Sequence, residues 1–140
     1  MKIETHYTGN KRFASGSGDA RVIMDATPDT GGAGVAPSPK SMLLYGLASC
    51  TGLDVVAILE KKKVSYDDFA IAVEAEQTNV HPKVFKRIRI TYRFVGDEAD
   101  RVHFDRAIEL SKNQFCGVSA MLAKTADIDV VLEITPRAGQ

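Results

Sequence analysis

The predicted architecture of this chain depends first on the stretch GLASCTGLDVVAILEKKK, Gly46 to Lys63. Its apolar residues recur at helical spacing, and other apolar residues fill the remaining faces, a pattern typical of a helix buried in the core. Pro39 suits a first helical turn, and the lysines at the other end suit the negative pole of the helix dipole. We therefore predict one long central helix from Pro39 to Lys63.

The patterns on either side of this helix predict short strands and two further helices. Turn residues and alternation indicate an antiparallel meander over residues 1–26, and a glycine- and proline-rich loop over 27–39. After the central helix we expect a hairpin of half-buried strands, an amphipathic helix, a short helix and a last strand, at 69–76 with 87–94, 104–115, 118–125 and 128–134. The chain thus combines helices and strands.

Length and composition describe an ordinary globular protein. The 140 residues suit a single domain, spanning residues 1–140, and 44% are hydrophobic against 26% charged. Eighteen basic residues balance eighteen acidic ones, so we expect no nucleic-acid partner. The N-terminus lacks the apolar segment of a signal peptide, and no apolar run reaches membrane-spanning length. We therefore expect a cytoplasmic protein without a membrane partner.

The arginines of the second hairpin strand raise one alternative to this view. Arg87, Arg89 and Arg93 share one face and could form a nucleic-acid stripe. Glu74 and Glu76 on the preceding strand can, however, pair with them across the ladder. A solvated sheet face is the favoured interpretation.

Chemistry is most strongly indicated by the two cysteines, Cys50 and Cys116. Both lie among small residues, which leave room for a reactant. Asp54 lies one turn beyond Cys50 and implies a polar pocket, but an anion raises a thiol's pKa, so a nearby cation would be needed to activate the thiol. The residues leave open which thiol attacks, and Cys50 could also be a small hydrophobic group at a helix interface.

Other kinds of site have weaker support. Gly117 to Met121 lacks the closing glycine of a serine-hydrolase elbow, and the glycine-rich loop lacks the order of a phosphate-binding motif. His6, His81 and His103 stand alone, and neither cysteines nor histidines have zinc-binding spacing. We expect no metal and no bound cofactor.

Three segments resemble the OsmC/Ohr family of osmotically inducible and organic hydroperoxide resistance proteins. They read PSPKSMLLYGLASCTGLDVVAIL, HPKVFKRIRITYRF and AIELSKNQFCGVSAML, and the resemblance spans nearly the whole chain. The form Cys-Thr-x-x-Asp-Val-Val is similar to the subfamily of small OsmC-like proteins. The resemblance implies an α+β fold in which two central helices pack on antiparallel sheets, within an intertwined homodimer whose active sites lie at the subunit interface.

The resemblance also implies roles for the cysteines. Cys50 would be the peroxidatic thiol of an organic hydroperoxide reductase, and Cys116 the resolving thiol. The resulting disulfide would be reduced by an external dithiol, with no metal or cofactor. Apolar walls would favour organic over hydrogen peroxide, with Met42, Leu43, Leu47, Phe115 and Met121 as lining residues. The alternative is a non-enzymatic dimer of this fold, acting as a redox sensor or a binder of an apolar ligand.

In the family's reductases an arginine from the N-terminal strands lies against the reactive thiol. Arg12 is the best match here, and Arg21 and Lys40 are the alternatives. The family's glutamate at the start of the central helix is replaced by Lys40-Ser41 after Pro39. We therefore expect Asp54 to anchor the Arg12 guanidinium in its place.

Overall fold

The computed structural model describes residues 1–17 and 20–139. The chain divides into two compact units, Met1–Leu44 and Tyr45–Gln140, and the division falls inside the long helix α1, Pro39–Lys62. Whether the chain acts as a single domain stays a prediction. The predicted central helix is confirmed, with its end at the lysine run.

The first unit contains the predicted meander. Strands β1 (Thr5–Gly9), β2 (Arg12–Ser17) and β3 (Ala20–Asp25) form an antiparallel sheet in that order. Asn10 and Lys11 join β1 to β2 with φ angles of 51° and 60°. Two successive left-handed residues match the twist of the flanking strands, which explains the tight hairpin.

The loop after β3 folds back onto the end of that strand. It contains a short 3-10 turn, Pro28–Thr30, and the backbone N–H of Asp25 donates to Pro37 O at 3.1 Å. At Gly32 an added Cβ would come within 1.9 Å of Ala26 O, so only glycine fits. This close approach explains why position 32 is a glycine. The glycines of this loop do not follow the order of a phosphate-binding motif.

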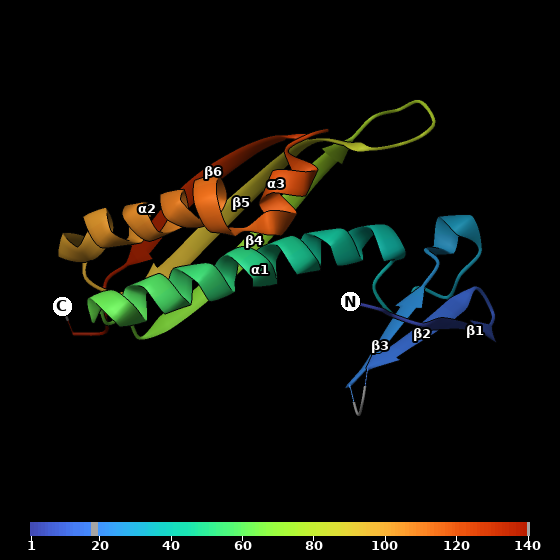
Figure 1. Ribbon diagram of the computed structural model, residues 1–140, viewed down its shortest axis with the longest axis horizontal. Coiled ribbons are helices and arrows are strands. Elements are labelled where there is room, and N and C mark those ends of the chain that lie inside the picture. Colours follow the sequence, from blue (N-terminus) through green and yellow to red (C-terminus); the bar gives the residue numbers. More distant parts are fainter. Residues whose placement is uncertain (18–19, 140) are drawn as a thin grey trace. The chain divides into compact units, whose positions relative to one another are not determined.

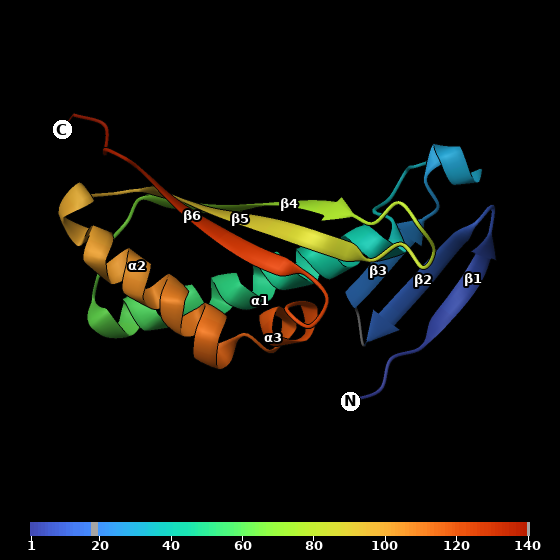
Figure 2. The ribbon, with the colours of Figure 1, turned by 90° about the horizontal axis from the view of Figure 1, so that it is seen from above.

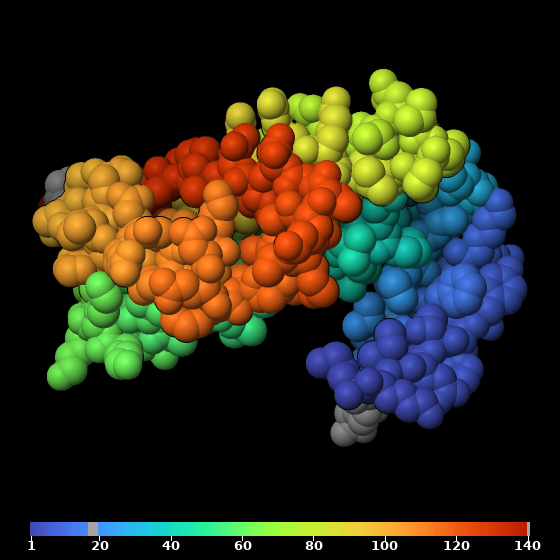
Figure 3. All heavy atoms as spheres, turned by 45° about the horizontal axis from the view of Figure 1, so that its top comes forward, coloured from blue at the N-terminus to red at the C-terminus, as the bar shows by residue number. Residues whose placement is uncertain are grey.

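The second unit is a three-stranded sheet covered on one face by helices (Figures 1 and 2). Strands β4 (Asp68–Gln77) and β5 (Phe85–Val95) form the predicted antiparallel hairpin. Helix α2 (Arg101–Leu110) follows, then a π-helical turn (Ser111–Phe115), helix α3 (Gly117–Leu122) and strand β6 (Asp127–Thr135). Figure 3 shows α2 and α3, in orange, beside β6 in red.

One detail of the predicted fold requires correction. The sheets were expected to be antiparallel, but β6 runs parallel to β5, with Ile88 opposite Ile128 and Phe94 opposite Ile134. A parallel partner needs a long crossover connection, and the helical segment between the two strands supplies it. Alternating apolar residues identify a strand but do not fix its direction.

The core lies between β5 and the helices. Ile88, Ile90, Tyr92 and Phe94 are buried, while the arginines between them are exposed, as their alternation predicts. Phe94 stacks with both Phe69 and Phe104, at centroid distances of 4.2 Å. These rings pack α2 against the sheet.

On the opposite face of the sheet the register places glutamates opposite arginines, and Glu76 Oε2 lies 3.5 Å from Lys86 Nζ. Glu74 lies opposite Arg89 and Glu76 opposite Arg87, and Arg93 Nε donates to Glu133 Oε2 at 2.9 Å. Cross-strand pairs of opposite charge are typical of a solvated face. The arrangement supports the favoured interpretation of the arginines.

Helix α1 differs from expectation in how much of it is covered. Four residues at i+4 spacing are buried, namely Leu47, Thr51, Val55 and Leu59. The apolar side chain of Leu53 is 72% exposed, because the chain covers only one side of the helix. Among the described helices, α1 alone is long and apolar enough to span a membrane. A single helix of this kind is weak evidence for a membrane span, because the core helix of a soluble protein passes the same test.

Candidate functional site

The two cysteines meet on the helical side of the second unit. Both are free thiols, and their Sγ atoms and a carboxylate oxygen of Asp54 all lie within 4.8 Å of one another. Cys50 and Asp54 are half-buried on successive turns of α1, and Cys116 is buried. The structure therefore brings together three of the four residues predicted for the site.

Cys116 occupies the position before the short helix α3. Its backbone is extended, and the backbone N–H of Ser119 donates to its Sγ at 3.3 Å. Gly117, which follows, begins the helix. Cys116 therefore lies at a helix start.

Asp54 is held by a buried chain of hydroxyl groups. Ser111 Oγ donates to Asp54 Oδ2 at 2.9 Å, and Thr51 Oγ1 lies 2.8 Å from Ser111 Oγ and 2.7 Å from Tyr92 OH. Burial raises the pKa of Tyr92 to about 12, so the phenol stays protonated and can donate. These hydrogen bonds link β5, α1 and the π-helical turn.

Sequence reasoning missed these hydroxyl residues. Thr51 and Ser111 occupy fully buried positions on the inner faces of helical segments. Buried hydroxyl groups require hydrogen-bond partners, so polar residues at apolar positions are the signal that could have revealed the network.

The surroundings of Cys50 disfavour its thiolate. Burial raises the pKa of the Cys50 thiol, and its hydrogen bond with Cys116 and the negative charges of Cys116 and Asp54 raise it further. A hydrogen bond from the Val118 backbone acts in the opposite direction. Cys50 therefore needs a cation for activation, as its sequence context indicates.

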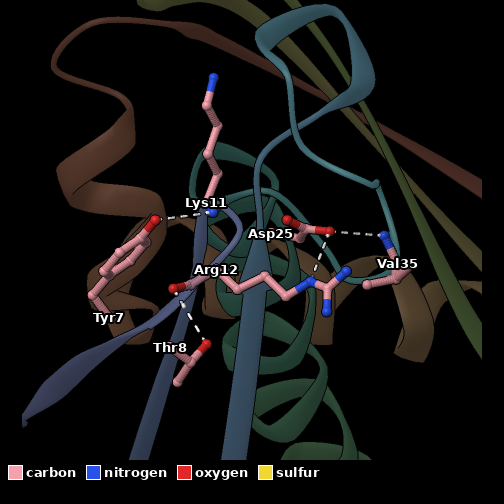
Figure 4. Close-up of polar contacts among 6 residues, drawn as sticks. All are labelled: Tyr7, Thr8, Lys11, Arg12, Asp25 and Val35. Atoms are coloured by element: carbon pink, nitrogen blue, oxygen red, sulfur yellow. Dashed lines mark hydrogen bonds and ion pairs between the residues drawn. The ribbon is translucent and has the colours of Figure 1, made fainter.

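Arg12, the fourth predicted residue, has a partner within the first unit. Its Nε lies 3.3 Å from Asp25 Oδ2, which also accepts the backbone N–H of Val35 at 3.1 Å (Figure 4). Burial acts against ionisation of Asp25, but the bonds from Val35 and Arg12 hold its pKa below the ordinary value. Asp25 was not among the predicted residues.

The expected anchoring of Arg12 by Asp54 stays a prediction, because each residue has its contact within its own unit. Arg12 pairs with Asp25, and Asp54 accepts from Ser111. Asp25 ends β3 directly before the glycine-rich loop. This position in the sequence was the signal that could have identified Asp25 as a site residue. Its presence means that Arg12 has a carboxylate partner even though the start of α1 carries no acid.

The apolar residues predicted to line the site divide into two groups. Leu47 is fully buried in the core, whereas Leu43, Phe115 and Met121 are exposed. Met42 is half-buried. The exposed members leave apolar surface on both α1 and the segment around Cys116.

Comparisons with known proteins identify the family. Residues 31–131 match the model for OsmC-like proteins. Protein YhfA from Escherichia coli K12 is 31% identical over 99 residues, which cover 71% of this chain and 74% of YhfA. The chain belongs to the OsmC-like family.

Solved structures share the fold. A hypothetical protein from Aquifex aeolicus VF5 superposes with a TM-score of 0.81 at 26% identity, covering 96% of each chain. An organic hydroperoxide resistance protein OsmC from Legionella pneumophila has a TM-score of 0.72 at 16% identity, covering 94% of this chain and 95% of its own. These likenesses confirm the α+β architecture.

Proposed function

We propose that the protein is a thiol-dependent peroxidase that reduces organic hydroperoxides. The observation that carries this proposal is the pair of free thiols, Cys50 and Cys116, whose sulfur atoms lie within 4.8 Å of each other. A disulfide has an S–S length of about 2 Å, so side-chain rotation with a small helix shift can form the bond. The organic hydroperoxide resistance proteins among the structural neighbours support the same class of substrate.

The reaction is a two-electron reduction of the O–O bond. The Cys50 thiolate attacks one peroxide oxygen, giving a sulfenic acid and an alkoxide that takes a proton to become the alcohol. The Cys116 thiol then attacks the sulfenic sulfur, forming the disulfide and releasing water. An external dithiol returns both cysteines to thiols and is itself oxidised to a disulfide.

Cys50 is the better candidate for the attacking thiol. It is half-buried, whereas Cys116 is only 2% exposed, so a peroxide reaches the Cys50 sulfur more easily. Exposed Leu43 and Phe115 offer apolar surface to the alkyl part of a substrate. Activation is assigned to Arg12, held by Asp25.

A homodimer is part of the proposal. Helix α1 carries exposed Leu43, Tyr45 and Leu53, and the meander carries exposed Tyr7 and Phe13. Large exposed apolar side chains on an element often mark an interface, and a second copy of the chain could cover them. We place this dimer in the cytoplasm, where reducing systems keep cysteines as thiols.

The second candidate is a redox sensor or a binder of an apolar ligand. The raised pKa of Cys50 favours it, because a protonated thiol reacts slowly with peroxide. Single turnover with cumene hydroperoxide separates the two functions. The peroxidase should consume one equivalent of peroxide, Cys50→Ser should consume none, and Cys116→Ser should stop at a sulfenic acid that dimedone traps. Unchanged peroxide in the wild-type reaction would favour the second candidate.

A further inference from the structure

The thiol pair and Asp54 also form a set of metal ligands. Two sulfur atoms and one carboxylate oxygen lie within 4.8 Å of one another. In tetrahedral zinc sites, Zn–S bonds of about 2.3 Å and Zn–O bonds of about 2.0 Å place ligand atoms about 3.5–3.8 Å apart. Side-chain rotations that bring these atoms about 1 Å closer would complete such a set.

From this arrangement we propose that the reduced protein binds Zn²⁺ through Cys50, Cys116 and Asp54. Thiolates select a borderline-soft ion such as zinc over calcium or magnesium, which prefer oxygen ligands. Three protein ligands leave a fourth position open for water or another small ligand. The separation of the cysteines along the chain hides this set from a search by sequence spacing.

The surroundings hold the ligands in place. Ser111 Oγ donates to one oxygen of Asp54 at 2.9 Å, and Thr51 fixes Ser111 from the other side. The Ser119 N–H fixes the sulfur of Cys116 at 3.3 Å. Such outer hydrogen bonds orient metal ligands and are worth roughly tenfold to a hundredfold in metal affinity.

Charge favours the ion as well. With both thiols deprotonated, the three groups bring three negative charges into a partly buried space, and a divalent cation offsets two of them. A zinc ion bound to both sulfur atoms would engage the lone pairs with which a thiolate attacks a peroxide. Zinc and peroxide turnover would then exclude each other, a consequence that rests on the proposed function, whereas the binding itself does not.

Zinc binding is measured on fully reduced protein without peroxide, by competition with a chromogenic chelator. We expect one ion per chain with a dissociation constant below about 10 μM. Cys50→Ser and Cys116→Ser should each abolish it, and Ser111→Ala should weaken it about tenfold to a hundredfold. Substitution with Co²⁺ should give a thiolate-to-metal charge-transfer band.

The matched control is His6→Ala. His6 and Glu4 form an exposed pair, with Nε2 3.3 Å from Oε1, that could hold zinc adventitiously. Affinity that survives both cysteine substitutions, or is lost in His6→Ala, would overturn the proposal. Circular dichroism of each variant separates a lost ligand from a lost fold. Because no peroxide is present, the result is independent of peroxidase activity.

Discussion

The guanidinium of Arg12 contacts the carboxylate of Asp25, with Nε 3.3 Å from Oδ2, and Asp25 is only 1% exposed. The same oxygen accepts the backbone N–H of Val35 from the loop that precedes α1. One buried acid thus holds both the arginine of β2 and the loop.

Asp25→Asn should destabilise the protein and flatten its response to acid. The folded-state pKa of Asp25 is below its ordinary 3.8, so its ionised form stabilises the fold above that pH. This contribution is lost as pH falls through the folded pKa. Urea unfolding from pH 7 down to pH 2 should show a smaller decline in the variant. Equal declines in variant and wild type would show that Asp25 is not linked to folding.

Asp54→Asn should make Cys50 more reactive. The charge of Asp54 helps to raise the pKa of the Cys50 thiol, and the isosteric amide removes that charge. A lower pKa of the thiol raises the thiolate fraction, which should speed alkylation by iodoacetamide at neutral pH by about threefold to tenfold. Glu60→Gln, an exposed charge change on the same helix, is the control. Slower alkylation in Asp54→Asn would instead support the anchoring of Arg12 by Asp54.

Arg12→Ala should slow the same alkylation. If Arg12 supplies the positive charge that Cys50 needs, its removal raises the thiol's pKa further and lowers the thiolate fraction at neutral pH. Arg21→Ala and Lys40→Ala serve as comparisons. If only Arg21→Ala or Lys40→Ala slows alkylation, that residue and not Arg12 activates the Cys50 thiol. If all three variants react as the wild type does, Cys50 is a structural thiol.

Leu53→Lys should disrupt the proposed dimer. Leu53 is exposed on α1 in the single chain, and a charge there cannot be buried against a partner without a large cost. Light scattering at micromolar concentration should give a dimer for the wild type and a monomer for the variant. Val80→Lys, on the exposed hairpin turn, should remain dimeric. A monomeric wild type would contradict the proposal.

Much of the fold could be predicted because local periodicity and end signals agree. Pro39 and the lysine run bound α1, and the alternation from Ile88 to Phe94 identifies the buried face of β5. The direction of β6 could not be predicted, because strand pairing depends on how the crossover returns. The exposure of one side of α1 could not be predicted either, because the sequence does not show which elements pack on the helix.

The part of the site that could be predicted consists of residues whose type and spacing in the sequence indicate their chemistry. Cys50 and Asp54 are one helical turn apart, so their proximity follows from the helix alone. Cys116 meets them only through the fold, and its inclusion rested on its small-residue neighbours and on the family resemblance. The Asp25 contact and the hydroxyl chain through Ser111 depend on tertiary packing, which residue patterns do not specify.

The proposed peroxidase function requires that a disulfide form between Cys50 and Cys116. Reduced protein should be mixed with one equivalent of cumene hydroperoxide and analysed by intact mass, thiol counting and peptide mapping. We predict one equivalent of the alcohol, loss of both thiols together, a mass decrease of two hydrogens, and a single peptide pair joined through these cysteines. Two intact thiols beside unreacted peroxide, or a stable sulfenic acid on Cys50 with Cys116 still free, would contradict it.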